Sequence, residues 1–107
     1  MSETTRILEQ ARTLVASGWC NGVAKDVSGR EVNPEDVSAR RFGLLGALLR
    51  VTGEMRLKNR PRSFESALRR LGRVVSDDAQ ADVVDLIDRR DSDKRAALRL
   101  LDRAIQG

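Results

Sequence analysis

Eight basic side chains between residues 50 and 73 are the residues of this sequence best suited to bind a partner. They are Arg50, Arg56, Lys58, Arg60, Arg62, Arg69, Arg70 and Arg73. Residues 40–73 carry ten basic and two acidic side chains, whereas the segments before and after each have a net charge of −2. Arginine donates paired hydrogen bonds to phosphates and carboxylates. The stretch therefore predicts a surface that binds an anionic partner, with a merely solvated face as the alternative.

The other reactive residue types argue against catalysis. The sequence has no histidine, no tyrosine and one cysteine, which excludes Ser–His–Asp and Cys–His nucleophiles and zinc sites built on several thiolates. Cys20 follows the predicted end of a helix, where the partial negative charge disfavours a thiolate, so we expect a small packed residue. We expect no enzyme activity, no metal site and no cofactor.

Two further patterns have a plain structural interpretation. Seven aspartates near the C-terminal end lack the alternating ligands, turn glycine and bidentate glutamate of a calcium loop, so they predict a solvated helix face. They are Asp77, Asp78, Asp82, Asp85, Asp88, Asp91 and Asp93. Asn21-Gly22 and Ser28-Gly29 lack the spacing of phosphate-binding loops and predict turns.

The elements that must position these residues are mostly helices. We predict a mainly α fold, a compact domain of four or five helices over residues 1–107 with one small β-hairpin after the first helix. Only Trp19, Phe42 and Phe64 are aromatic, so the core must be aliphatic and Trp19 should be buried. The first helix should span Thr4–Ser17 with an apolar stripe, a serine or threonine cap and Gly18 at its end.

A hairpin over about residues 20–32 should follow, with a type I turn at Asp26–Gly29 and a return strand at residues 30–32. Asn33 and Pro34 then predict the start of a central, most buried helix over about residues 34–52. The small residues Gly43 and Gly46 inside it indicate either close approach by another backbone or a kink. Trp19 should tie the first helix to this one.

The last third of the chain is expected to be helical. Ser63 should cap a third helix that ends near Gly72. A fourth should open at Ser76-Asp77-Asp78, and a fifth should follow a cap at Asp91-Ser92-Asp93. The apolar stripe of the fifth helix is Ala97, Leu98, Leu101, Ala104 and Ile105.

Several short motifs resemble those of an uncharacterised family of small bacterial and phage-borne proteins. They are Gly18-Trp19-Cys20-Asn21-Gly22, Asp26-Val27-Ser28-Gly29-Arg30, Leu45-Gly46-Ala47-Leu48, and Asp91 before the last helix. Two positions depart from the family pattern: Arg89-Arg90 replaces Trp-Asn, and Phe42-Gly43-Leu44 lacks the cysteine often found there. The resemblance implies the architecture and carries no established activity.

The function that these observations favour is a small non-catalytic interaction protein that binds a macromolecular partner through the arginine-rich surface. A regulator or defence inhibitor of a phage or mobile element is one form of it. The alternative is sequence-nonspecific nucleic-acid binding by the same surface. We expect a protein or nucleic-acid partner, no membrane association and a cytoplasmic location, since the longest apolar run, Phe42–Leu49, is too short to span a bilayer.

Overall fold

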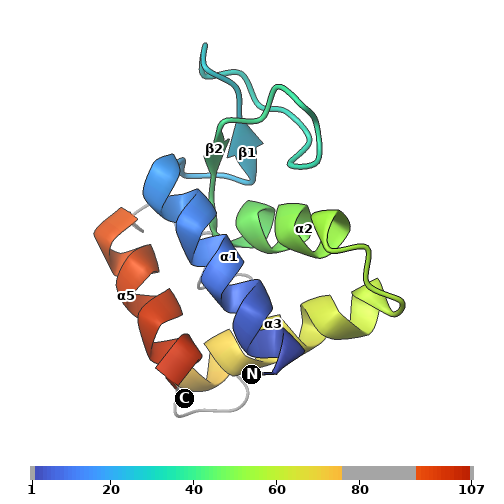
Figure 1. Cartoon of the computed structure of the whole chain (residues 1–107). Helices are drawn as coiled ribbons and strands as arrows, with labels where there is room; N and C mark the ends of the chain where they lie inside the picture. The colour runs from blue at the N-terminus through green and yellow to red at the C-terminus, as the bar shows by residue number, and fades with distance from the viewer. Residues whose placement is uncertain (1, 76–93, 107) are drawn as a thin grey trace.

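Four helices and a small two-stranded sheet make up the described parts of the chain, residues 2–75 and 94–106 of this computed structural model. The helices are α1 (Glu3–Ser17), α2 (Leu44–Glu54), α3 (Arg60–Val75) and α5 (Lys94–Gln106), and the strands are β1 (Ala24–Lys25) and β2 (Arg41–Phe42). The helices form one body, and the strands with their loops project from one end of it (Figure 1). The predicted mainly α fold with a small sheet after the first helix is confirmed.

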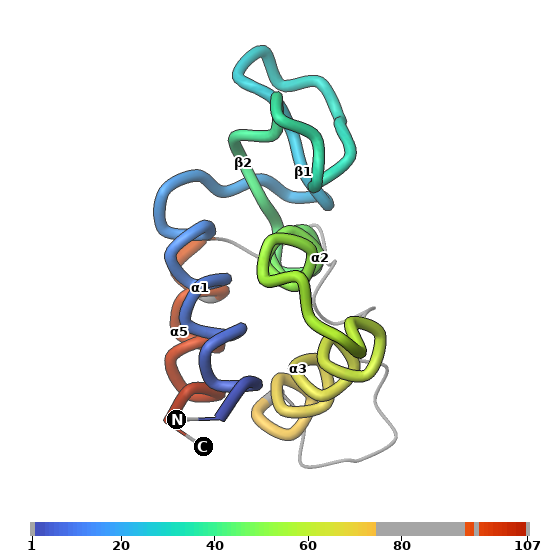
Figure 2. Tube along the Cα trace, turned by 45° about the vertical axis from the view of Figure 1, so that its right-hand side comes forward, coloured from blue at the N-terminus to red at the C-terminus, as the bar shows by residue number. Residues whose placement is uncertain are grey.

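Helix α1 lies at the centre of the helical body, where it contacts α2, α3, α5 and β2 (Figures 1 and 2). Its start is capped by Ser2, whose Oγ accepts a hydrogen bond from the Thr5 N–H at 3.1 Å. The stripe that it buries, Ile7, Leu8, Ala11 and Val15, is fully shielded from solvent. The predicted first helix is therefore confirmed, but α1 occupies the central place that the sequence assigned to the second helix.

The core is aliphatic, as predicted, and is shared by all four described helices. Helix α2 is the most buried along its length, as predicted for the second helix, since six of its eleven residues are buried against four of the fifteen in α1. Leu71 of α3 and Leu101 of α5 are fully buried on facing helices, and each leucine removed from water contributes about 1.5–3 kcal/mol. The predicted stripe of the last helix is correct: Ala97, Leu101 and Ala104 are buried, and Leu98 and Ile105 pack against the core.

The predicted helix over residues 34–52 is wrong in its first ten residues, because only Leu44–Glu54 forms α2. Asn33 does cap a turn, with its Oδ1 accepting from the Glu35 N–H at 2.9 Å. Asp36 then caps a second turn, with its Oδ1 accepting from the Ser38 N–H at 2.8 Å. Side chains of Asn and Asp offer the backbone such local partners in place of helical ones, so two short turns form where one helix was predicted.

The predicted turn at residues 26–29 is present, but the main strand partner lies elsewhere. Gly29 has φ +91°, and its N–H donates to the Asp26 carbonyl at 3.1 Å. The return segment makes one antiparallel bridge, between Lys25 and Glu31. The two-residue ladder instead pairs β1 with β2, Ala24 opposite Phe42. Strand β2 was missed because it lay within the predicted helix.

We call the projecting segment the β-lobe (residues 18–43). Two glycines permit close backbone approaches within it, and a third, Gly46, permits one between it and α2. A Cβ on Gly46 of α2 would overlap the Val23 carbonyl and lie 2.7 Å from its carbon. A Cβ on Gly43 would overlap the Gly22 carbonyl, and one on Gly18 would overlap the Arg40 carbonyl. The close backbone approach predicted from Gly43 and Gly46 is therefore correct.

Helix α3 begins earlier and ends later than predicted. It starts at Arg60 and continues through Gly72 to Val75. Ser63 lies inside the helix, buried, and its Oγ donates a hydrogen bond to the Glu3 carboxylate of α1, so it is not the cap. Pro61 is tolerated because the first turn of a helix needs no N–H there. The predicted fourth helix and the cap at Asp91-Ser92-Asp93 lie outside the described residues.

Candidate anion-binding surface

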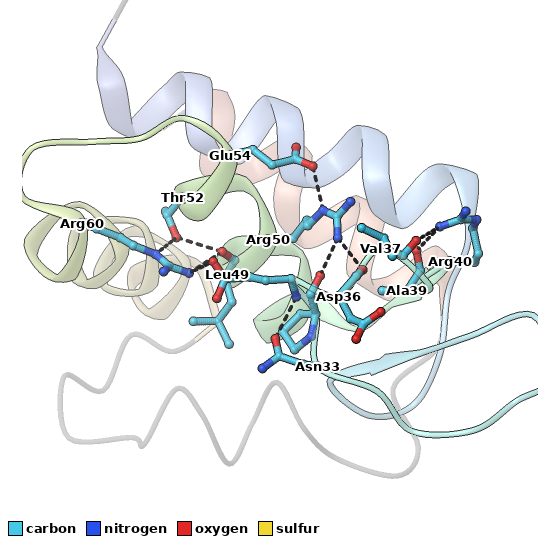
Figure 3. Close-up of polar contacts among 12 residues, drawn as sticks. Asn33, Asp36, Val37, Ala39, Arg40, Leu49, Arg50, Thr52, Glu54 and Arg60 are labelled. Carbon is cyan, nitrogen blue, oxygen red and sulfur yellow. Dashed lines mark hydrogen bonds and ion pairs between the residues drawn. The ribbon is translucent and has the colours of Figure 1, made fainter.

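Arg50, the first of the eight basic residues, is a structural clamp. From α2 its Nη1 donates to the Pro34 and Asp36 carbonyls at 3.1 and 2.8 Å, and its Nε pairs with Glu54 at 2.7 Å (Figure 3). Its guanidinium also lies 6.0 Å from the centre of the Phe42 ring. Arg50 therefore holds the turns of residues 33–39 against α2, which leaves its guanidinium little capacity for a partner.

Arg60 performs a similar structural role between α3 and α2. Its Nη2 donates to the Leu49 carbonyl at 2.9 Å, and its Nε donates to Thr52 Oγ1 at 3.3 Å (Figure 3). The same Nη2 lies 2.7 Å from Oε1 of Glu35. Arg60 thus joins the start of α3 to α2 through the Leu49 carbonyl, which also accepts from Thr52 Oγ1 at 3.2 Å.

Of the other six predicted residues, Arg70 is half-buried and donates to Thr5 Oγ1, and the remaining five form two groups. Arg56 and Lys58 are exposed on the connector between α2 and α3, and Arg56 lines a hollow of about 340 Å³ together with Glu35 and Glu54. Arg62, Arg69 and Arg73 are exposed on one face of α3, at positions i, i+7 and i+11, and we call them the α3 arginine stripe. The structure therefore does not bring the eight residues into one continuous surface.

The α3 arginine stripe has no acidic partner within residues 2–75 and 94–106. The ion pairs found there join Arg12 to Asp102, Arg50 to Glu54 and Arg60 to Glu35. Arg62, Arg69 and Arg73 form neither an ion pair nor a hydrogen bond with any of these residues. Their positive charge therefore faces outward from α3 without a described counter-charge.

Two of these arginines border a polar hollow between α3 and the start of α1. This α1–α3 hollow has a volume of about 190 Å³ and is lined by Thr4, Ser66, Arg69, Arg70 and Arg73. The described residues that line the hollow carry three guanidinium groups and two hydroxyl groups, and none of them carries a carboxylate. Such a donor set suits a phosphate or carboxylate.

The chain belongs to a family that has no assigned function. The model of the family described as "Family of unknown function (DUF6197)" matches residues 1–107. This chain is a DUF6197 protein. Neither the curated proteins nor the solved structures contain a significant match to it. Family membership agrees with the resemblance to an uncharacterised family and adds no activity, so the function of this DUF6197 chain must be inferred from its surface.

Cys20 of this DUF6197 chain is buried, as expected, and is a poor nucleophile. Burial raises the pKa of its thiol above the ordinary value, and the nearby positive charge of Lys25 offsets this only in part. Trp19 is half-buried against the core, and its Nε1 donates to Asn21 Oδ1 at 3.1 Å. It also lies beside Phe42 through a parallel bridge. Both residues therefore belong to the joint between α1 and the β-lobe.

The sequence did not single out Thr4 and Ser66 as members of a site, because isolated hydroxyl residues form no pattern. The helical spacing of Ser66, Arg69, Arg70 and Arg73 was the available signal, since these positions share one side of α3. Within the described ranges, no three acidic, thiol or imidazole side chains gather as metal ligands would, and no helix has the length and apolar content to cross a bilayer. The seven aspartates lie outside those ranges.

Proposed function

We propose that this protein is a non-catalytic binding module that recognises an acidic protein partner through the α3 arginine stripe. The observation that carries the proposal is the contrast among the arginines. Arg50 and Arg60 are committed to contacts within the fold, whereas Arg62, Arg69 and Arg73 are exposed on one face without a described acidic partner. At 1.5 Å per residue, the stripe extends along roughly 16 Å of helix, a length suited to a row of carboxylates.

The residue inventory supports binding over catalysis. The chain has no histidine or tyrosine, and its one thiol is buried with a raised pKa. Among the described residues, the lining of the α1–α3 hollow includes no carboxylate, thiol or imidazole that could act as an acid or base beside the arginines. A regulator or defence inhibitor of a phage or mobile element is one form of this function. A cytoplasmic location belongs to the proposal, because a free thiol such as Cys20 persists there.

Nucleic-acid binding is the second candidate, and the α1–α3 hollow favours it because guanidinium and hydroxyl groups are the usual donors to phosphates. The aromatic residues count against single strands. Trp19, Phe42 and Phe64 are all buried or half-buried, so none offers an exposed ring on which bases could stack. Binding would then depend on phosphate contacts alone, without sequence preference.

A pair of charge-matched variants tests the proposed function. The triple variant Arg62→Gln, Arg69→Gln and Arg73→Gln removes the stripe. The control Arg95→Gln, Arg99→Gln and Arg103→Gln removes the same charge from exposed positions of α5. Pull-down from a host lysate treated with nuclease should recover a protein partner with the wild type and the control, and lose it with the stripe variant.

Two outcomes would contradict this function. Equal loss of the partner in both variants would indicate nonspecific charge attraction. Recovery of bound material only when the nuclease treatment is omitted, together with direct binding to mixed-sequence DNA or RNA that weakens steeply with salt, would favour the nucleic-acid alternative. Absence of binding to duplex and single strands at low salt would exclude that alternative.

A further inference from the structure

Within the basic surface, the α1–α3 hollow is a single recess that three arginines and two hydroxyl residues line together. Arg69, Arg70 and Arg73 line it beside the hydroxyl residues Thr4 and Ser66. We propose that this hollow binds one phosphomonoester group, carried by a phosphorylated side chain of the protein partner. The proposal rests on the proposed function and deepens it by naming the chemical group that the surface recognises.

The guanidinium of Arg70 is held in place before any ligand binds. Its Nη1 donates to Thr5 Oγ1 at 2.7 Å, and the same oxygen accepts from Ser2 Oγ at 2.8 Å. Ser2 is itself fixed as the cap of α1. The remaining N–H groups of Arg70 can serve a ligand at little entropic cost, because its side chain is already ordered.

Two hydrogen bonds fasten the start of α1 to α3 beside the hollow. Ser63 donates to Glu3, and Arg70 donates to Thr5, so two bonds join the first turn of α1 to α3. The first N–H groups of a helix lack internal acceptors, and the helix dipole places about half a positive charge at that end. The dipole therefore adds to the three guanidinium charges and favours an anion next to Thr4.

The charge of the hollow matches a phosphomonoester better than a phosphodiester. A phosphorylated side chain carries about −1.5 to −2 charges at pH 7 and offers three acceptor oxygens, whereas each diester carries one charge. Glu65, one turn before Arg69, does not line the hollow and forms no ion pair with Arg69. Three guanidinium groups thus face the ligand without a carboxylate among their lining neighbours.

Titration of the isotopically labelled full chain with two acidic peptides tests the proposal. The peptides are identical except for one central serine, which is phosphorylated in one of them, and dimethyl phosphate serves as a diester probe. At constant ionic strength the phosphopeptide should bind at least about tenfold more tightly, which corresponds to about 1.4 kcal/mol. The backbone N–H signals of Thr4 and Ser66 should shift most.

Two single variants locate the site. Arg73→Gln should weaken phosphopeptide binding by about tenfold or more, the loss expected for one charged hydrogen-bonding partner. Arg95→Gln removes one exposed charge from α5, outside both the hollow and the α3 arginine stripe, and should change binding by less than about twofold at the same ionic strength. Arg73 and Arg95 are both exposed, and Trp19 fluorescence verifies that each variant is folded.

The outcomes separate this inference from the proposed function. If both peptides bind equally and the stripe variant loses both, the acidic-partner function stands and the phosphate site is refuted. An equal loss from Arg95→Gln and Arg73→Gln would also refute a discrete site. If neither peptide binds but a DNA duplex does, both the inference and the protein-partner function fail.

Discussion

The contact between Gly46 and the β-lobe yields the sharpest test of the structure. Gly46 lies inside α2, where replacement by alanine would ordinarily stabilise a helix by about 1 kcal/mol. Here a Cβ would overlap the carbonyl oxygen of Val23 and lie 2.7 Å from its carbon. Both atoms belong to the backbone, and the Val23 carbonyl also accepts the Gly43 N–H at 3.1 Å. The Gly46→Ala variant must therefore push the β-lobe away from α2.

The net effect follows from two opposing contributions. Overpacking against atoms that cannot rotate away costs about 1–3 kcal/mol or more, and loss of the Gly43–Val23 hydrogen bond adds about 1 kcal/mol. After subtraction of the helix propensity gain, Gly46→Ala should destabilise the protein by about 2 kcal/mol. For a domain of this size, that corresponds to a fall in Tm of roughly 8–16 °C.

A second glycine of the same helix supplies the control. A Cβ on Gly53 would meet the carboxylate end of Glu35, a flexible side chain that can move, so Gly53→Ala should be neutral or slightly stabilising. Urea unfolding is followed by circular dichroism for the helices and by Trp19 fluorescence for the joint with the β-lobe. Equal or greater stability of Gly46→Ala, or equal effects of both substitutions, would refute the close approach of the two backbones.

Three further predictions concern residues with defined partners. Arg50→Ala should lower the free energy of unfolding, measured with urea, by about 1–3 kcal/mol because it removes charged hydrogen bonds. Arg56→Ala should change it by no more than about 0.5 kcal/mol. Similar values for the two variants would contradict the structural role of Arg50. Because burial raises its pKa, the Cys20 thiol should react with a chromogenic disulfide reagent far more slowly than free cysteine, and a matching rate would contradict burial. Hydrogen bonds from Ser28 hold the pKa of Asp26 below its ordinary value. The ionised carboxylate therefore stabilises the turn above about pH 4, and this stabilisation is lost as the pH falls through the lowered pKa. The amide signal of Ser28 should report a midpoint below about 3.9, and a higher midpoint would contradict the bonds.

The helices were predictable because their apolar stripes recur with one period and their caps are local. Ser2 and Gly18 mark the ends of α1 in the sequence as they do in the structure. The turns of residues 33–39 were not predictable, because an asparagine such as Asn33 can begin either a helix or a short turn. The bonds from Arg50 to Pro34 and Asp36, made across the fold, hold those turns against α2.

The candidate site was predictable in its charge and not in its shape. The sequence identified Arg69, Arg70 and Arg73, because like charges concentrate there. It also included Arg50 and Arg60, since nothing in a linear pattern distinguishes an arginine that binds carbonyls of its own fold from one that faces solvent. The carbonyls of Pro34, Asp36 and Leu49 that accept from these two arginines come near them only in the folded chain.

The pairing of α1 with α5 sets the order in which this fold can be completed. The two helices lie side by side, and the ion pair between Arg12 and Asp102 joins positions 90 residues apart. Contacts so distant in sequence form late, because the intervening chain must first be brought together. The apolar side of α1 that faces α5 therefore stays open until that helix arrives. During synthesis α1 leaves the ribosome before α5, so part of its apolar side must wait for this neighbour.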